Sequence, residues 1–137
     1  MLPSESRMRH RSEFTLAVRR GTRAGRPTVT GHLFTPPPDG PPTGSHRRSD
    51  LEPQPGEPAR VGFIVSRAVG TAVVRNRVKR RLRVLARGYL GVLPTGSLLV
   101  VRANPPAAAA RQADLAADLD LVMNRLLRRQ VGAQRQS

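Results

Sequence analysis

The residues with the most distinctive chemistry in this chain lie at positions 73–83, which read VVRNRVKRRLR. Arg and Lys supply most of these side chains, and their cationic groups bind phosphate oxygens through charge-assisted hydrogen bonds. Val74, Val78 and Leu82 recur every four residues, which is the spacing of one helix face. The segment therefore predicts a helix that holds a row of cations rigidly against a polyanion.

A helical projection at 100° per residue separates the two kinds of side chain. The apolar residues form a narrow stripe that we expect to dock on a sheet: Val74, Val78, Leu82, Leu85 and Tyr89. The polar residues form a wide face that we expect to point away from the protein: Arg75 at its edge beside the stripe, then Asn76, Lys79, Arg80, Arg83 and Arg87, with Arg77 and Arg81 further round. Like charges four residues apart, such as Lys79 and Arg83, repel each other, and a bound polyanion relieves that repulsion.

The charge of the whole chain favours the same kind of partner. Its 137 residues include 24 basic and 9 acidic side chains, for a net charge of +15. The interval 58–113 contains many Arg residues and no Asp or Glu. Net charge indicates partners rather than fold, and nucleic acid is the commonest polyanion. An anionic membrane surface is the alternative, although the apolar stripe is too narrow to serve both a membrane and a core.

Several other functions lack the residues that they need. The chain has no Cys, and its three His have no metal-ligand spacing. The basic region offers no carboxylate cluster and no nucleophile–base pair, so we expect no catalytic or metal-binding residues and no small-molecule substrate. No apolar run reaches the roughly 18–20 residues that cross a bilayer, and the N-terminus lacks the apolar stretch of a secretory signal. We therefore expect a soluble, cytoplasmic protein.

Composition and turn residues predict the elements that position the basic helix. A short helix is expected at 12–20, with Ser12 as its N-cap and Gly21 at its end. Residues 36–58 include many prolines, and we interpret them as a disordered loop that enlarges a hairpin connection. The other expected elements are strands at 27–35, 60–66 (buried on both faces) and 97–102, the basic helix at about 71–88, a turn at 91–96, a helix at 107–129 and a frayed end from 130. Together they predict one α+β sandwich domain, residues 1–137, with a Pro-rich insertion at about 36–58.

Residues 61–83, VGFIVSRAVGTAVVRNRVKRRLR, resemble the protein subunit of bacterial ribonuclease P. The matching features are a strand that ends in Val-Ser, a basic residue, and the pattern Val-Gly-x-Ala-Val-x-Arg-Asn-Arg-x-Lys-Arg. The Arg-Asn-Arg at 75–77 is its most specific part. The resemblance continues at Leu2-Pro3, Arg7, Phe14 and Gly21, and again in SLLVVRANPPAA at 97–108. It covers the chain except for the Pro-rich loop and the tail.

The resemblance implies a fold, an activity and partners. The fold is a small sheet of about four strands, with the basic helix on a left-handed βαβ crossover and further helices at both ends. The activity is the removal of the 5′ leader from precursor tRNA. A catalytic RNA that requires Mg²⁺ performs the hydrolysis, and the protein, inactive alone, binds both that RNA and the single-stranded leader.

The resemblance also implies roles for individual residues. Those expected to contact the catalytic RNA are Arg75, Asn76, Arg77, Lys79, Arg80, Arg81, Arg83 and, on the same face, Arg87. Those expected at the leader are Phe14, Val18, Ser66 and Arg67. At Val18 the family often has a second aromatic, so stacking of about 1–3 kcal/mol per base is lost there. Two further departures are Ala68, where a cation is usual, and Val84, where an acid is common.

Two alternatives stay open from the residues themselves. Phe14 is either a core residue of its helix or a platform on which a base stacks. The protein as a whole is either a ribonuclease P subunit or a ribosomal or RNA-chaperone module on the same fold.

Overall fold

The computed structural model describes residue 8, residues 11–35 and residues 59–136, with side chains as far as residue 128. The Pro-rich segment 36–58 lies outside the described residues, so its interpretation as a disordered insertion into a single domain stays a prediction. The helices and strands are α1 (Arg11–Arg20), β1 (Thr22–Gly25), β2 (Val29–Phe34), β3 (Arg60–Ile64), α2 (Ala72–Arg87), β4 (Leu98–Ala103) and α3 (Gln112–Gln136). Short 3₁₀ turns occur at Arg67–Val69, Leu90–Val92 and Pro105–Ala108.

The strands form a mixed sheet in the order β1-β2-β4-β3. β2 pairs antiparallel with both β1 and β4, whereas β3 and β4 are parallel neighbours joined through α2. The α+β class and the fourth strand implied by the resemblance are confirmed. The left-handedness of the β3-α2-β4 crossover stays a prediction.

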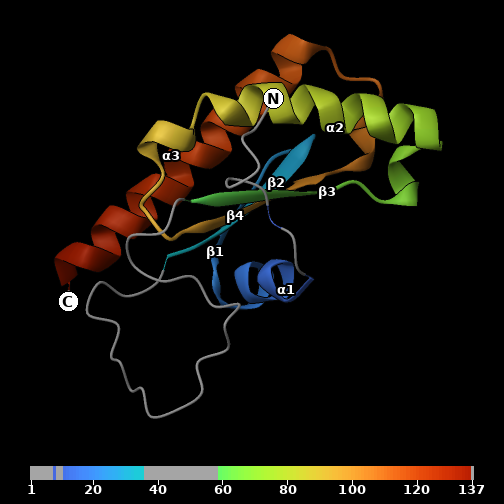
Figure 1. Ribbon diagram of the computed structural model, residues 1–137. Helices are drawn as coiled ribbons and strands as arrows, with labels where there is room; N and C mark the ends of the chain where they lie inside the picture. The colour runs from blue at the N-terminus through green and yellow to red at the C-terminus, as the bar shows by residue number, and fades with distance from the viewer. Residues whose placement is uncertain (1–7, 9–10, 36–58, 137) are drawn as a thin grey trace.

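Helices cover both faces of the sheet, with α1 on one side and α2 and α3 on the other (Figure 1). The sequence of β4 produces these two layers, because successive side chains of a strand point to opposite faces. Leu98 and Val100 pack with Ala17 of α1, whereas Leu99 and Val101 belong to the larger core under α2 and α3. The sheet is therefore a rigid support for helices on both sides.

The long helix α3 packs very closely on β2. A Cβ atom at Gly31 would lie 2.6 Å from Cγ1 of Val122 and 3.0 Å from Cδ1 of Leu126, so only glycine fits there without movement. Leu115 and Leu119, on the same side of α3, are also fully buried. The apolar side predicted for this helix is thus the side that packs on the sheet.

Two predictions about the strands were wrong. β3 is an edge strand, so its continuous apolar run does not indicate burial on both faces, and Phe63 and Ile64 stay partly exposed. β2 and β3 are separated by β4, so residues 36–58 do not connect a hairpin. The pattern of residues within a strand gives no information about which other strands lie beside it.

Helix ends also differed from the predictions. α1 begins at Arg11, which places Ser12 inside the helix rather than at its N-cap. α3 begins at Gln112 rather than 107, because Pro105–Ala108 forms a 3₁₀ turn and the Asp114 carboxylate accepts a hydrogen bond from the Arg111 N–H. α3 also continues to Gln136, where a frayed end was expected.

Candidate nucleic-acid interface

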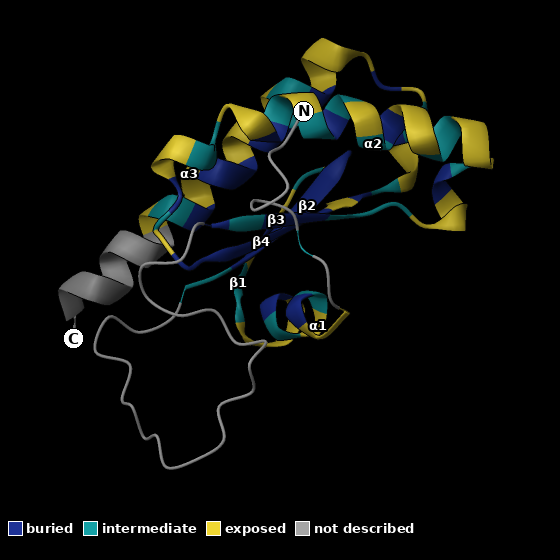
Figure 2. Cartoon of the chain, viewed as in Figure 1, coloured by how far each residue is buried: buried dark blue, intermediate teal, exposed yellow. Residues whose placement is uncertain are grey.

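The basic helix α2 has clear local reasons to form and to stay in place. The Thr71 hydroxyl caps its N-terminus by accepting a hydrogen bond from the Val74 N–H at 3.3 Å. Val78 and Leu82 are fully buried, as the predicted stripe requires, and Ala86 joins them. Figure 2 shows α2 with buried residues toward the sheet and exposed residues on its outer side. Because the stripe is packed into the core, it is not exposed to a membrane surface.

The cations of α2 fall into two groups. Five make no side-chain hydrogen bond or ion pair with any residue that the structure describes: Arg77, Lys79, Arg80, Arg83 and Arg87. Two others, predicted to point away from the protein, instead donate to backbone carbonyls. Arg75 Nε lies 3.3 Å from the Gly70 oxygen, and Arg81 Nη1 lies 3.0 Å from the Ala110 oxygen. The first group is therefore available to a polyanion, while Arg75 and Arg81 also hold α2 to its surroundings.

A large cavity of about 590 Å³ lies on the α1 face of the sheet, beside Val18 of α1. It exists because β4 changes from apolar to polar on this face, from Leu98 and Val100 under α1 to Arg102 further along. The pairing of Arg102 with Thr30 on one side and Ile64 on the other forms its floor. Its lining residues are Val18, Arg23, Thr30, His32, Ile64, Arg102 and Asn104.

The charges in this cavity favour an anionic ligand. His32 is 7% exposed and lies between two cations. Burial lowers the pKa of His32 below its usual value, and the nearby Arg23 and Arg102 lower it further. The two guanidinium groups give the cavity a positive potential, and the His32 imidazole adds a polar, hydrogen-bonding wall.

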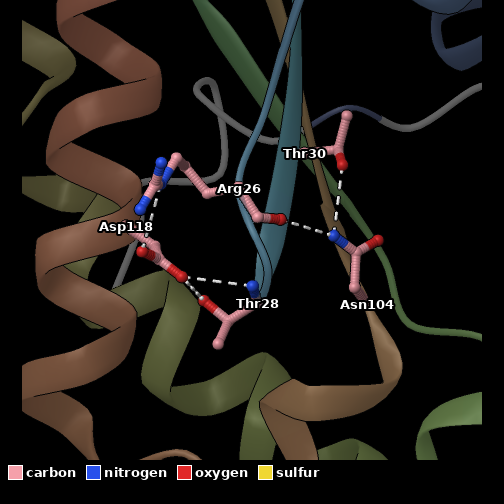
Figure 3. Close-up of polar contacts among 5 residues, drawn as sticks. All are labelled: Arg26, Thr28, Thr30, Asn104 and Asp118. Atoms are coloured by element: carbon pink, nitrogen blue, oxygen red, sulfur yellow. Dashed lines mark hydrogen bonds and ion pairs between the residues drawn. The ribbon is translucent and has the colours of Figure 1, made fainter.

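A network of polar contacts fixes the far end of this cavity (Figure 3). The Asn104 amide donates to the Arg26 carbonyl at 3.0 Å and to the Thr30 hydroxyl at 3.2 Å. Asp118 of α3 accepts from the Thr28 hydroxyl at 2.6 Å and N–H at 3.1 Å, and it pairs with Arg26 at 3.5 Å. Burial alone would raise the pKa of Asp118, but the hydrogen bonds from Thr28 and Arg26 outweigh it and hold the pKa below its usual value. The network ties α3 to the turn before β2.

An ion pair with a buried carboxylate sets the position of α1, on the face of the sheet opposite to α3 (Figure 1). Glu13 is 1% exposed, and its carboxylate accepts a hydrogen bond from Arg60 Nη1 of β3 at 2.5 Å. At the other end of α1, the guanidinium of Arg20 lies 5.6 Å from the centre of the Phe34 ring. These contacts hold the first helix against both β3 and β2.

The residues predicted to bind the leader do not lie in one place. Val18 lines the large cavity, whereas Phe14 lines a separate, smaller pocket of about 160 Å³ at the edge of β3, together with Lys79 and Arg83 of α2. Ser66 and Arg67 are exposed just after β3 and line neither of these two hollows. Phe14 is both a core residue and a lining residue, so the two alternatives for its role are not exclusive.

Sequence reasoning missed most of the residues that line the large cavity. Thr30 and His32 alternate with Val29, Gly31 and Leu33, and this alternation was the available signal. It assigns Thr30 and His32 to one face of β2. Arg23 and Arg102 gave no such signal, because only the pairing of the strands brings them beside His32.

Comparison with known proteins relates the chain to one family. The sequence pattern of the ribonuclease P family matches residues 2–127. The ribonuclease P protein component of Streptomyces avermitilis is 52% identical over 131 residues, which span 93% of this chain and 96% of the relative. That of Nocardioides sp. is 48% identical over 126 residues, or 92% of this chain and 95% of the relative.

Solved structures show the same fold. The ribonuclease P protein of Staphylococcus aureus superposes with a TM-score of 0.66 at 17% identity, covering 93% of each chain. That of Thermotoga maritima, solved with a fluorophenyl thiourea, gives 0.61 at 24% identity, covering 89% of this chain and 98% of the other. None of the helices that the structure describes has both the length and the apolar character of a membrane span. The chain belongs to the ribonuclease P protein component family.

Proposed function

We propose that this chain is the RNA-binding protein subunit of ribonuclease P, an endoribonuclease, and that it assists in removing the 5′ leader from precursor tRNA. Membership of the family supports this role, and the alternative of a ribosomal or chaperone module on the same fold is not favoured. The partners follow from it: the ribonuclease P RNA and precursor tRNA. Its place of action is then the cytoplasm, where precursor tRNA is made in bacteria.

The observation that carries the proposal is the row of cations on the rigid helix α2, five of which have no side-chain partner among the residues that the structure describes. The side chains assigned to the catalytic RNA are Arg75, Asn76, Arg77, Lys79, Arg80, Arg81, Arg83 and Arg87. Cations that have no internal partner give up no interaction within the protein when they bind phosphates, and they release counterions from the RNA. Arg75 and Arg81 already hydrogen-bond to carbonyls, so we assign them a mixed role, in which they position α2 and contact RNA with their remaining N–H groups.

We assign the 5′ leader to the α1 face of the sheet. Val18 lines the large cavity there, and Ser66 and Arg67 follow directly from β3, whose last residue Ile64 lines the same cavity. The two arginines that flank His32 would attract the leader phosphates, and the polar wall offers hydrogen bonds to base edges. Phe14 would stack on RNA at the edge of β3.

In this proposal the RNA performs the hydrolysis and holds the Mg²⁺ ions. Among the residues that the structure describes, no three His, Cys, Asp or Glu side chains are grouped so as to bind a metal. The protein's own contribution is to neutralise the repulsion between two RNAs and to hold the leader. Its effect is therefore expected mainly as tighter binding of the precursor at low Mg²⁺, where the RNA has fewest counterions of its own.

The test is cleavage of precursor tRNA by the protein alone, by the RNA alone and by both together, over a series of Mg²⁺ concentrations. We expect no cleavage by the protein alone, and stimulation of the RNA that diminishes as Mg²⁺ rises. The double variant Arg75→Ala/Arg77→Ala should weaken assembly with the RNA. Cleavage by RNA-free protein that disappears when an acidic residue is replaced would contradict the proposal.

A further inference from the structure

The small pocket at the edge of β3 brings together Phe14, which was expected to bind the leader, and two cations of α2 that were expected to bind the catalytic RNA. It has a volume of about 160 Å³. Phe14 comes from α1 and Phe63 from β3, while Lys79 and Arg83 come from α2, which lies on the other face of the sheet. Because β3 is an edge strand, side chains from both faces can meet around it.

The aromatic part of the pocket is held firmly. A Cβ atom at Gly62 would lie 2.5 Å from Cε1 and Cζ of Phe14, so the ring fills the space that a side chain at position 62 would need. The Met8 sulfur lies against the same position, and the Met8 N–H donates to the Val61 carbonyl at 3.1 Å. A ring fixed in this way can stack on a base without first losing conformational freedom.

The two cations of the pocket lie close together and have no anionic partner among the described residues. Lys79 and Arg83 are one helical turn apart and repel each other, and neither has a hydrogen bond or ion pair with any residue in the described part of the chain. Both are nevertheless only partly exposed. An anionic group between them would remove the repulsion.

We propose that this pocket receives one unpaired nucleotide, with its base against Phe14 and Phe63 and its phosphate between Lys79 and Arg83. A ligand with a flat, apolar face and an attached anion fits both halves of the pocket. The inference rests on the proposed function, and it adds Met8 and Phe63 to the residues that contact RNA. It also makes Phe14, Lys79 and Arg83 parts of one site. The nucleotide belongs either to the catalytic RNA or to the leader, and the experiment distinguishes these sources.

The test is a double-mutant cycle at constant salt, with two readouts. One is the affinity of the protein for ribonuclease P RNA, and the other is the affinity of the assembled holoenzyme for precursor tRNA with and without its leader. The variants are Phe14→Leu, Lys79→Gln and their combination. Arg80→Gln removes the same charge from α2 outside the pocket, and Phe34→Leu removes a partly buried ring elsewhere.

We expect Phe14→Leu to weaken one of the two affinities about fivefold or more. The combination with Lys79→Gln should weaken that affinity by less than the product of the two single effects, because both changes release the same nucleotide. The combination of Phe14→Leu with Arg80→Gln should give the full product, and Phe34→Leu should leave both affinities unchanged. Coupling in the first readout assigns the nucleotide to the catalytic RNA, and coupling that depends on the leader assigns it to the precursor.

Independent effects of Phe14 and Lys79 in both readouts, or no effect of Phe14→Leu, would overturn the pocket while leaving the proposed function intact. If neither Lys79→Gln nor Arg80→Gln changes RNA affinity, the basic-helix proposal fails instead. Thermal unfolding of each variant shows whether it is folded. Should Phe14→Leu prove unfolded, Phe63→Leu takes its place in the cycle with the same expectations.

Discussion

Glu13 brings a negative charge into the interior of a chain whose net charge is +15. Its carboxylate pairs with Arg60 on β3. The Arg60 side chain is 30% exposed, so water partly screens the pair. The pair positions α1, and with it Phe14, relative to the edge of the sheet.

We expect Glu13→Gln to lower the free energy of unfolding by about 1–3 kcal/mol, because a buried neutral amide replaces the carboxylate of a charge-assisted hydrogen bond. Urea unfolding measures this difference. Asp120→Asn is the matched control, since it removes the same charge at an exposed position. Equal decreases in the two variants would mean that the buried pair has no special role.

His32 predicts a pH dependence of stability. Its pKa in the folded protein is lowered, chiefly by burial and then by Arg23 and Arg102. As the pH falls through the usual His pKa of about 6.5, the unfolded chain binds a proton that the folded chain does not. The stability of the folded protein therefore decreases toward lower pH, by at most about 1.4 kcal/mol per pH unit from this group.

The measurement is urea unfolding of the wild type and of His32→Asn at pH 8 and at pH 5.5. The other two histidines, His10 and His46, are present in both proteins, so the difference between the two pH dependences isolates His32. The stability of the variant should decrease less on acidification than that of the wild type. A parallel pH dependence of the two proteins would show that His32 is not destabilised in its charged form.

At the scale of elements, the basic helix was the part best predicted from sequence. Its apolar spacing, Thr71 and Gly88 all lie within one continuous segment, so local pattern was sufficient. β1 was missed because its four residues, TRAG, carry no alternation, and only pairing with β2 makes them a strand. The carbonyl partner of Arg81 was missed for a related reason. Arg81 bonds to Ala110, 29 residues away, and nothing in the basic segment indicates that interaction.

The two groups of cations on α2 predict different outcomes for the same kind of substitution. Arg77→Ala/Arg80→Ala should reduce the slope of log affinity against log salt by about 0.7–0.9 for each phosphate that the helix no longer neutralises, with little change in stability.

Arg81→Ala should instead lower the free energy of unfolding by about 0.5–1.5 kcal/mol, because the Ala110 carbonyl is left without its donor. A salt titration of RNA binding and urea unfolding measure the two effects. An unchanged salt slope in the double variant would be evidence against binding of phosphates by this face.

In the molecule as a whole, the order of strands in the sheet determines how long the connection between β2 and β3 has to be. The last residue of β2, Phe34, and the first of β3, Arg60, both pair with Leu98, one on each side of β4. Two strand spacings of about 4.8 Å separate them. A few extended residues at about 3.3 Å each are long enough to cover this distance, so the fold itself does not require the length of segment 36–58.

We therefore expect that deletion of residues 37–57, with a short Gly-Ser turn in their place, leaves the fold and precursor tRNA processing intact. Shortening a long loop changes the closure entropy only slightly, since that entropy varies with the logarithm of loop length. Thermal unfolding and the cleavage assay are the measurements. A deletion variant that is folded yet fails to stimulate cleavage would reveal a function for the segment.

The position of β4 also has a consequence for the order in which the protein is made. β4 is the last strand in the chain, but it lies inside the sheet and pairs with both β2 and β3. While the chain emerges from the ribosome, the β1-β2 hairpin and β3 have no strand between them to complete the sheet until residues 98–103 appear. The basic helix is thus synthesised before the surface on which it docks is complete. A nascent chain halted before Leu98 would carry the whole cation row without the rigid support that gives it its shape.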